Sequence, residues 1–433
     1  MFHALEALKA LEAQQAKFTS FDRFVQASLE ELRAALLRFF ATPAEEVVSR
    51  LEDTFAPGAL PTCEHAGAGP HGVLRFGCGW DNHRAARQWA LERIAGITTL
   101  AVDGSQIFPA KEYAIPVAAV QAGWYENPHD PARQYIKDVR MRIVPTTELS
   151  QHHGDGTLAE WRVHALRFDL EITTMLERMK AWNGAFARQR PPVIFLDGAL
   201  VLTFANSLPD GRIYTNAVLS LLRASEEHGV PVVAYIDTSL ARDVAKMLGQ
   251  FYGLEVPEGI SDALLYQGLD MRWGDRSEAF LCRRDDTLRV YLDDEGRDFS
   301  RSICFVYLQA TAELPPVRIE CAANSLSGQA IPTVWRPPMR RLCSAPRIAS
   351  VSSGCSKSSP GATVSRSTLR PRQPANGGGG ERCSSDVSSS PTRMWIMCAI
   401  STAWARCRTR RRQTTTRSDS GCVSPQAYRG GAR

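Results

Sequence analysis

Short apolar runs alternate with amphipathic helical segments from residue 97 to about residue 310. The runs are rich in Val, Ile, Leu and Ala, and the segments between them repeat apolar residues at helical spacing. Strands separated by helices are typical of an α/β protein whose helices cover the faces of its sheet. The predicted strands are 98–105, 114–126, 135–145, 192–200, 230–239, 279–283 and 303–310, and the predicted helices are 158–182, 214–229, 240–249 and 260–269.

Two of these strands are predicted to end on the same dipeptide. Asp103 in "TTLAVDGS" and Asp197 in "VIFLDGAL" each follow an apolar run and precede a glycine. One Asp-Gly alone would indicate only a surface turn, but two neighbouring strands that both end in this way would bring the carboxylates together. Carboxylates held close repel one another unless a cation lies between them, and hard oxygen ligands suit Mn²⁺ or Mg²⁺. The sequence therefore predicts a divalent-metal site suited to phosphoryl chemistry.

A third carboxylate is expected from the helix at 158–182. Glu171 is our choice, because Arg167 lies four residues earlier on the same helix face and can reach it. Asp169 and Glu177 are alternatives, and each of the three could instead belong to a solvated face.

Asp237 ends the strand at 230–239 and is a possible further member of the carboxylate site. In the alternative interpretation, Thr238 or Ser239 caps the helix that follows and no chemistry is involved.

Basic residues gather in "RQYIKDVRMRIVP". Arg133, Lys137, Arg140 and Arg142 lie on or near one predicted strand and form a candidate strip for contacts with phosphate groups. The alternative is an exposed edge strand that its charges protect from pairing with other chains. A separate loop-like stretch contains five possible zinc ligands whose spacing matches no common zinc motif. These are Cys63, His65, His71, Cys78 and His83.

The chain divides into four parts: a helical region at 1–60, a loop and short helix at 61–96, the α/β core at 97–321, and a tail at 322–433. The tail has 18 Lys+Arg and 3 Asp+Glu, which leaves 33 basic and 43 acidic residues before it. Its Ser, Arg, Pro and Gly content is typical of a disordered segment that binds nucleic acid. It also contains six cysteines and three tryptophans, which favours translation in a wrong frame beyond residues 321–330. The chain has no run of eighteen apolar residues and no signal-peptide core, so we expect a cytoplasmic protein without a membrane segment.

The motifs together resemble the NurA family of DNA double-strand break repair nucleases. The resemblance rests on "TTLAVDGSQIF", the Arg-x-x-x-Glu helix, "FLDGAL" and "VYLQATAELPPVRIE", and covers about residues 75–321. It implies an RNase H-like core with Asp103, Glu171 and Asp197 as catalytic, metal-binding carboxylates. It also implies Mn²⁺-dependent 5′-to-3′ exonuclease and endonuclease activity on DNA in end resection. A homodimer and a HerA/FtsK-type hexameric ATPase partner are implied as well.

The chain departs from this family after the "RIE" segment. Members continue with an apolar helix, a Gly-Tyr-Pro turn and a histidine, whereas this chain has no Gly-Tyr-Pro and no histidine beyond His228. The alternative function is therefore a catalytically impaired or truncated NurA-like subunit that binds the ATPase or DNA without cutting. A more distant alternative is a small-molecule phosphohydrolase that uses the same carboxylates.

Overall fold

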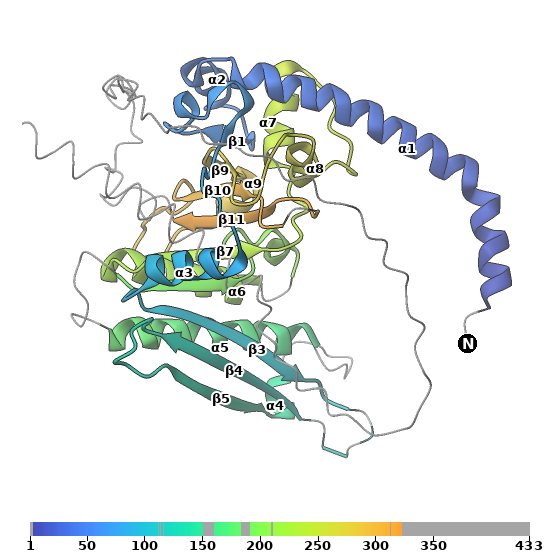
Figure 1. The fold of residues 1–433 in the computed structure, drawn as a ribbon. Coiled ribbons are helices and arrows are strands. Elements are labelled where there is room, and N and C mark those ends of the chain that lie inside the picture. Colours follow the sequence, from blue (N-terminus) through green and yellow to red (C-terminus); the bar gives the residue numbers. More distant parts are fainter. Residues whose placement is uncertain are drawn as a thin grey trace, which may run out of the picture.

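The computed structural model describes residues 3–322, apart from positions 111, 113, 116, 150–159, 183–190, 209–210 and 312. Both interpretations of the tail concern a segment that lies almost entirely outside the described residues. Within the described part, the chain forms an 11-stranded mixed sheet in the order β1-β9-β10-β11-β7-β6-β3-β4-β5, with β2 and β8 attached beside β10 (Figure 1).

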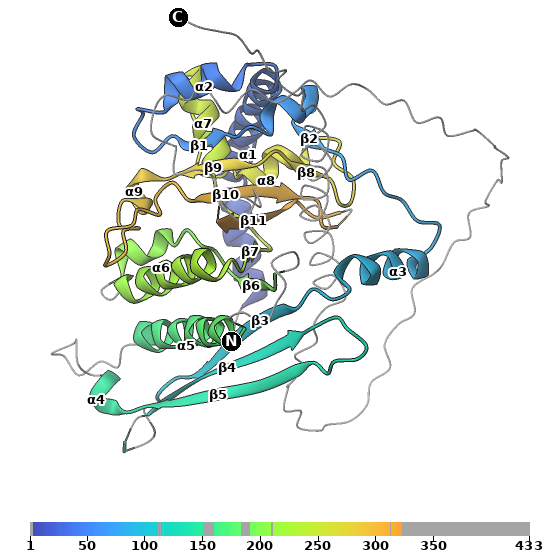
Figure 2. The same ribbon diagram turned by 90° about the vertical axis from the view of Figure 1, so that its left-hand side faces the viewer.

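One half of the sheet, from β7 to the edge strand β5, has the RNase H-like order that the resemblance implies. Its strands are β3 (Thr99–Ile107), β4 (Ala118–Asn127), β5 (Ile136–Val144), β6 (Val193–Asp197) and β7 (Val232–Ile236). The first three pair antiparallel, and β3, β6 and β7 are parallel neighbours. Two long helices, α5 (Glu160–Ala181) and α6 (Gly211–His228), precede β6 and β7 in the chain and pack together, with α5 also lying on β3 and β4 (Figure 2). The predicted mixed sheet flanked by helices is confirmed.

The sheet continues beyond β7 with short antiparallel strands. These are β11 (Val317–Ala322), β10 (Ile303–Leu308), β9 (Phe280–Arg283), β1 (Gly58–Pro61), β8 (Arg276–Ser277) and β2 (Val73–Leu74). The interpretation of residues 61–96 as only a loop and a short helix was incomplete, because β2 in this part pairs with β8. Most of β1 lies in the part predicted as helical, residues 1–60, and pairs with β9. Such short segments rich in Gly and Pro carry no alternating pattern, so only their partners identify them as strands.

The N-terminal residues form the predicted helices and share the core of the sheet. The remaining helices are α1 (Ala4–Phe40), α2 (Ala44–Leu51), α3 (His83–Ile94), α4 (Thr146–Leu149), α7 (Asp243–Tyr252), α8 (Asp262–Gln267) and α9 (Asp285–Leu288), with 3₁₀ turns at His65–Gly67, Gly69–His71 and Thr203–Ser207. The last turns of α1 bury Leu32, Leu36 and Phe39, whereas its first half projects from the body and exposes Leu8 and Phe18 (Figure 1). None of the helices in the described ranges combines the length and apolarity needed to span a bilayer.

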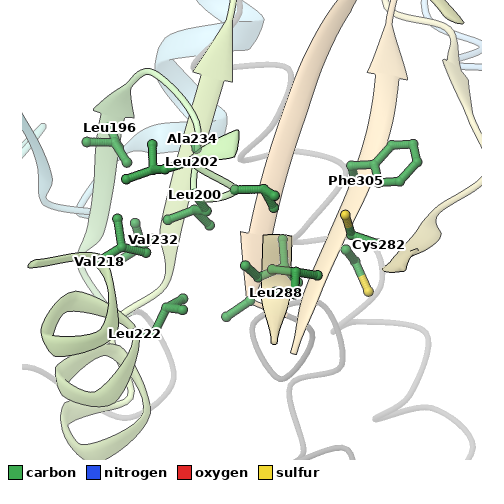
Figure 3. Close-up of a cluster of buried hydrophobic side chains, with 14 of the residues drawn as sticks. Leu196, Leu200, Leu202, Val218, Leu222, Val232, Ala234, Cys282, Leu288 and Phe305 are labelled. Atoms are coloured by element: carbon green, nitrogen blue, oxygen red, sulfur yellow. The ribbon is translucent and has the colours of Figure 1, made fainter. Parts of the chain in front are cut away.

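One large apolar cluster connects the helices to both halves of the sheet. Val218 and Leu222 of α6 lie against Leu196 and Val232, and the cluster continues to Phe305 of β10 (Figure 3). The side chains of Leu200 and Leu202, in the segment after β6, fill the space between these groups (Figure 3). The segment that follows Asp197 is therefore anchored in the core, which fixes the position of the strand end.

Candidate active site

The two Asp-Gly sequences lie on neighbouring parallel strands. Val102 of β3 is opposite Leu196 of β6 in the ladder, so the next residues, Asp103 and Asp197, stand at the same level. Adjacent strands are about 4.8 Å apart, and both aspartates are exposed. The structure thus brings the two predicted carboxylates side by side.

The two glycines have different roles. The prediction that the first strand ends at the Asp-Gly was wrong, because β3 continues to Ile107 with β4 as its partner. Only its pairing with β6 stops before Asp103. A Cβ atom on Gly104 would lie 2.0 Å from Oε1 of Glu171, so this glycine provides room for a carboxylate and not a turn. Gly198, in contrast, has φ +144°, a backbone conformation that side chains rarely permit.

Glu171 is placed by α5 directly against β3. Its side chain is 7% exposed, and Nη1 of Arg167 lies 3.1 Å from its Oε1. The same Nη1 donates a hydrogen bond to the carbonyl oxygen of Gly104 at 3.2 Å. Oε1 of Glu171 is nevertheless buried and accepts no hydrogen bond of good geometry. It is therefore a carboxylate oxygen with unused capacity for a ligand.

The electrostatics connect Glu171 to both aspartates. Burial raises the pKa of Glu171 to about 7; the charge of Arg167 lowers it, while the charges of Asp103 and Asp197 raise it. The negative charges of two nearby carboxylates disfavour ionisation of a third carboxyl group, and a bound cation favours it. The three residues therefore form one electrostatic unit.

This unit is open. In the described ranges, no group of three or more His, Cys, Asp or Glu side chains is arranged so that it could hold a metal ion. Successive side chains of a strand point to opposite faces. The side chain of Asp103 therefore projects from one face of β3, whereas Gly104 contacts Glu171 on the other face. The chemistry of the donors still fits a hard divalent cation, because three carboxylates are present and the buried Oε1 of Glu171 accepts no hydrogen bond of good geometry.

The other carboxylates that the sequence suggested occupy different environments. Glu177 forms a two-bonded ion pair with Arg140, and burial raises the pKa of Asp169. Asp237 follows β7 and accepts a hydrogen bond at 2.9 Å from the hydroxyl of Tyr235, the residue opposite Asp197. Asp237 thus lies at the same edge of the sheet, and its membership of the site stays a prediction.

The basic strip is divided between two faces of β5, the edge strand of the sheet. Arg140 and Arg142 pair with Glu177 of α5 and Glu148 of α4, while Lys137 occupies the alternate face of the strand. Arg133 lies in the loop before β5. Phosphate binding by these four residues stays a prediction.

The zinc alternative is wrong. His65, the buried member of the five candidate ligands, places Nδ1 2.9 Å from the carboxylate of Glu278 and Nε2 2.8 Å from the carbonyl oxygen of Thr42. Both ring nitrogens are therefore used in a structural hydrogen-bond network, and no metal-holding group is found among the described residues.

Sequence reasoning missed a buried ionic cluster beside the candidate site. Asp243 at the start of α7 binds both Arg284 and Arg318, and Arg318 also binds Glu320 in its own strand, β11. Arg318 and Asp243 are each 1% exposed. The only sequence signal was the "RIE" segment, which contains Arg318 and Glu320.

Carboxylates thus lie on β3, β6 and α5 of the mixed sheet, and it is the family comparison that assigns the chain to a class of nucleases. Residues 97–336 match the family model described as the NurA domain, and the chain belongs to the NurA family. The crystal structure of the NurA nuclease from Sulfolobus solfataricus is similar, with 13% identity over 74% of this chain and 81% of that chain and a TM-score of 0.36. The catalytic domain of human endonuclease V is similar at 13% identity over 54% of this chain and 72% of that chain, with a TM-score of 0.23. The comparison with curated proteins found no match.

Gly104→Ala is expected to displace Glu171 and to lower nuclease activity by about tenfold to a hundredfold, because misplaced active-site groups lose transition-state interactions. The added Cβ would lie 2.0 Å from Oε1 of Glu171. Gly123→Ala is the matched control, because Gly123 is directly opposite Asp103 on β4 and its added Cβ would meet nothing closer than 3.9 Å. Equal cleavage rates for the two variants would show that Gly104 provides no room for the site.

Glu171→Gln is expected to stabilise the metal-free protein at pH 8 by about 1–3 kcal/mol. The pKa of Glu171 is about 7 in the folded state against 4.5 as the reference. As the pH rises, the unfolded carboxyl ionises first, so the folded parent loses stability between about pH 4.5 and about pH 7. Urea unfolding in EDTA at pH 5 and pH 8 measures this. Glu177→Gln should show no such gain, and a Glu171→Gln variant no more stable than the parent at pH 8 would contradict the prediction.

Proposed function

We propose that the chain is a divalent-metal-dependent nuclease that hydrolyses DNA phosphodiester bonds with Asp103, Glu171 and Asp197 as its metal-binding carboxylates. The observation that carries this proposal is that Asp103 and Asp197 stand at one level of β3 and β6, and that both raise the pKa of the buried Glu171. Mn²⁺ or Mg²⁺ bound there would supply polarisation of the phosphoryl group and an activated water.

The residues of the chain have distinct parts in this proposal. Asp103 and Asp197 are exposed and can approach a bound DNA strand from the sheet edge. Glu171 must be ionised to act as a ligand, so activity rises with pH toward and above its pKa of about 7. Arg167 holds Glu171 beneath Gly104 through its contacts with both residues.

The wider biological role is also proposed. Family membership supports 5′-to-3′ exonuclease and endonuclease activity in the resection of double-strand breaks, together with a HerA-type ATPase. The exposed leucines and phenylalanines in the first half of α1, among them Leu5, Leu11 and Phe21, support association with a second copy or another partner. A cytoplasmic location is consistent with this role.

The direct test is cleavage of end-labelled linear duplex and single-stranded DNA in Mn²⁺, in Mg²⁺ and in EDTA. We expect metal-dependent products that shorten from the 5′ end. Hydrolysis of p-nitrophenyl phosphate without cleavage of DNA would instead select the small-molecule phosphohydrolase.

A second function is a subunit that binds the ATPase or DNA without cutting. The sequence has no histidine after His228, and the carboxylates of the described residues do not form a closed metal site. Co-purification with the ATPase and no cleavage with any metal would select this function.

A further inference from the structure

A cavity opens beside the proposed active site, at the edge of the sheet where β6 and β7 end. Its volume is about 240 Å³, and its lining includes Ala199, Ile236, Leu240, Arg284 and Arg318. Ala199 is only two residues beyond Asp197, and Ile236 pairs with Arg318 across β7 and β11. The cavity is thus next to the proposed active site along the sheet, on the side away from β3.

The carboxylates around this cavity already have partners. The carboxylate of Asp243 accepts hydrogen bonds from Nε and Nη2 of Arg284 and forms an ion pair with Nη1 of Arg318. One oxygen of Glu320 accepts from Nε of Arg318 at 2.8 Å, and the other accepts from the backbone N–H groups of Leu200 and Val201. Because every one of these oxygens is used, the two carboxylates have little capacity left for a cation or an amine.

The guanidinium of Arg318, in contrast, has a spare donor. Its Nη1 reaches Asp243 at 2.7 Å and donates to the hydroxyl of Tyr307 at 3.1 Å, but its buried Nη2 has no hydrogen-bond partner. The side chain is 1% exposed, and its Cζ lies 3.8 Å from the centre of the Phe305 ring, so the plane of the group is fixed. An unpaired donor on a buried cation costs free energy unless a ligand accepts from it.

We propose that this cavity, with Arg318 and Arg284 in its wall, binds a phosphate group of the DNA strand next to the phosphate that is cut. The inference rests on the proposed function and gives its substrate a second point of attachment. A phosphate oxygen is the acceptor that a fixed, unpaired guanidinium N–H suits best. Holding a neighbouring phosphate positions the strand across Asp103 and Asp197 and contributes no sequence preference.

Leu240 at the cavity lining allows a test that leaves the buried ion pairs intact, because its side chain is 82% exposed. In the full chain with Mn²⁺, we expect the KM for linear DNA to rise in the order Leu240→Lys, Leu240→Gln, Leu240→Glu. Each step should be about threefold, the size expected for one exposed charge near a phosphate, and should shrink at high salt. The value of kcat should change little, because the site positions the strand and does not touch the reacting atoms. Leu91→Glu, at an exposed position of α3, controls for charge placed elsewhere.

The outcomes separate the possible ligands. Equal KM values for the Lys, Gln and Glu variants of Leu240 would overturn the proposal, as would an equal effect of Leu91→Glu. Inorganic phosphate is the second probe, and its effect on the melting temperature of the metal-free chain is compared between the parent and Leu240→Glu. If the KM values rise in the expected order and inorganic phosphate does not stabilise the chain, the cavity is a site for phosphates of the DNA strand. If inorganic phosphate stabilises the parent more than Leu240→Glu but the KM values are equal, the cavity is a site for free phosphate and the DNA inference is overturned. If Asp103→Asn retains full cleavage, the proposed function fails independently of this result.

Discussion

Asp103→Asn is expected to lower the rate of DNA cleavage by about a hundredfold or more, because a bound metal contributes several kcal/mol to stabilisation of the transition state. Asparagine has nearly the same size and removes the charge from the position level with Asp197. The pKa of Glu171 should fall in this variant, because one of the charges that raise it is gone. Initial rates on linear duplex DNA across a Mn²⁺ titration measure the effect.

Asp286→Asn is the control for this prediction. Asp286 is exposed on the short helix α9, outside the carboxylate unit, and its replacement should leave the rate unchanged. A parent-like rate for Asp103→Asn, with unchanged circular dichroism, would remove Asp103 from the active site and the metal mechanism with it.

Asp243→Ala is expected to lower the free energy of unfolding by about 3–5 kcal/mol, because it leaves buried guanidinium groups without their carboxylate. Asp243 is 1% exposed and binds both Arg284 and Arg318. Burial would raise the pKa of Asp243, but the two arginines together lower it. The contribution of this cluster is therefore present at neutral pH and lost as the pH falls through the depressed pKa.

Urea unfolding at pH 7 of Asp243→Ala and of Asp270→Ala makes the comparison. Asp270 also pairs with an arginine, Arg75, but its side chain is 75% exposed, and exposed pairs contribute about 1 kcal/mol or less. Similar losses for the two variants would show that the buried cluster does not stabilise the fold.

The strands and helices of the core could be predicted from the sequence because burial imposes a visible pattern. Central strands such as β6 and β7 are covered on both faces and need continuous apolar runs, while α6 needs an apolar stripe. The short strands β1, β2 and β8 have no such pattern, since hydrogen bonds to distant partners alone define them. The charged residues of β11 look like surface residues in the sequence, and only their partners in distant segments, Asp243 for Arg318 and the backbone of Leu200 for Glu320, explain their burial.

The sequence by itself determined the mixed α/β core, the helical N-terminal region and the repeated Asp-Gly that pointed to Asp103 and Asp197. These features follow from local periodicity and from the chemistry of single residue types. Both can be read from the sequence without knowledge of the tertiary structure. Only the tertiary structure decided that Gly104 makes room for Glu171, that Arg140 of β5 pairs with Glu177 of α5, and that Arg318 keeps one donor unpaired beside the site. Each of these depends on which distant segments pack together, and contacts across the sheet are set by register and burial that no local stretch of sequence contains.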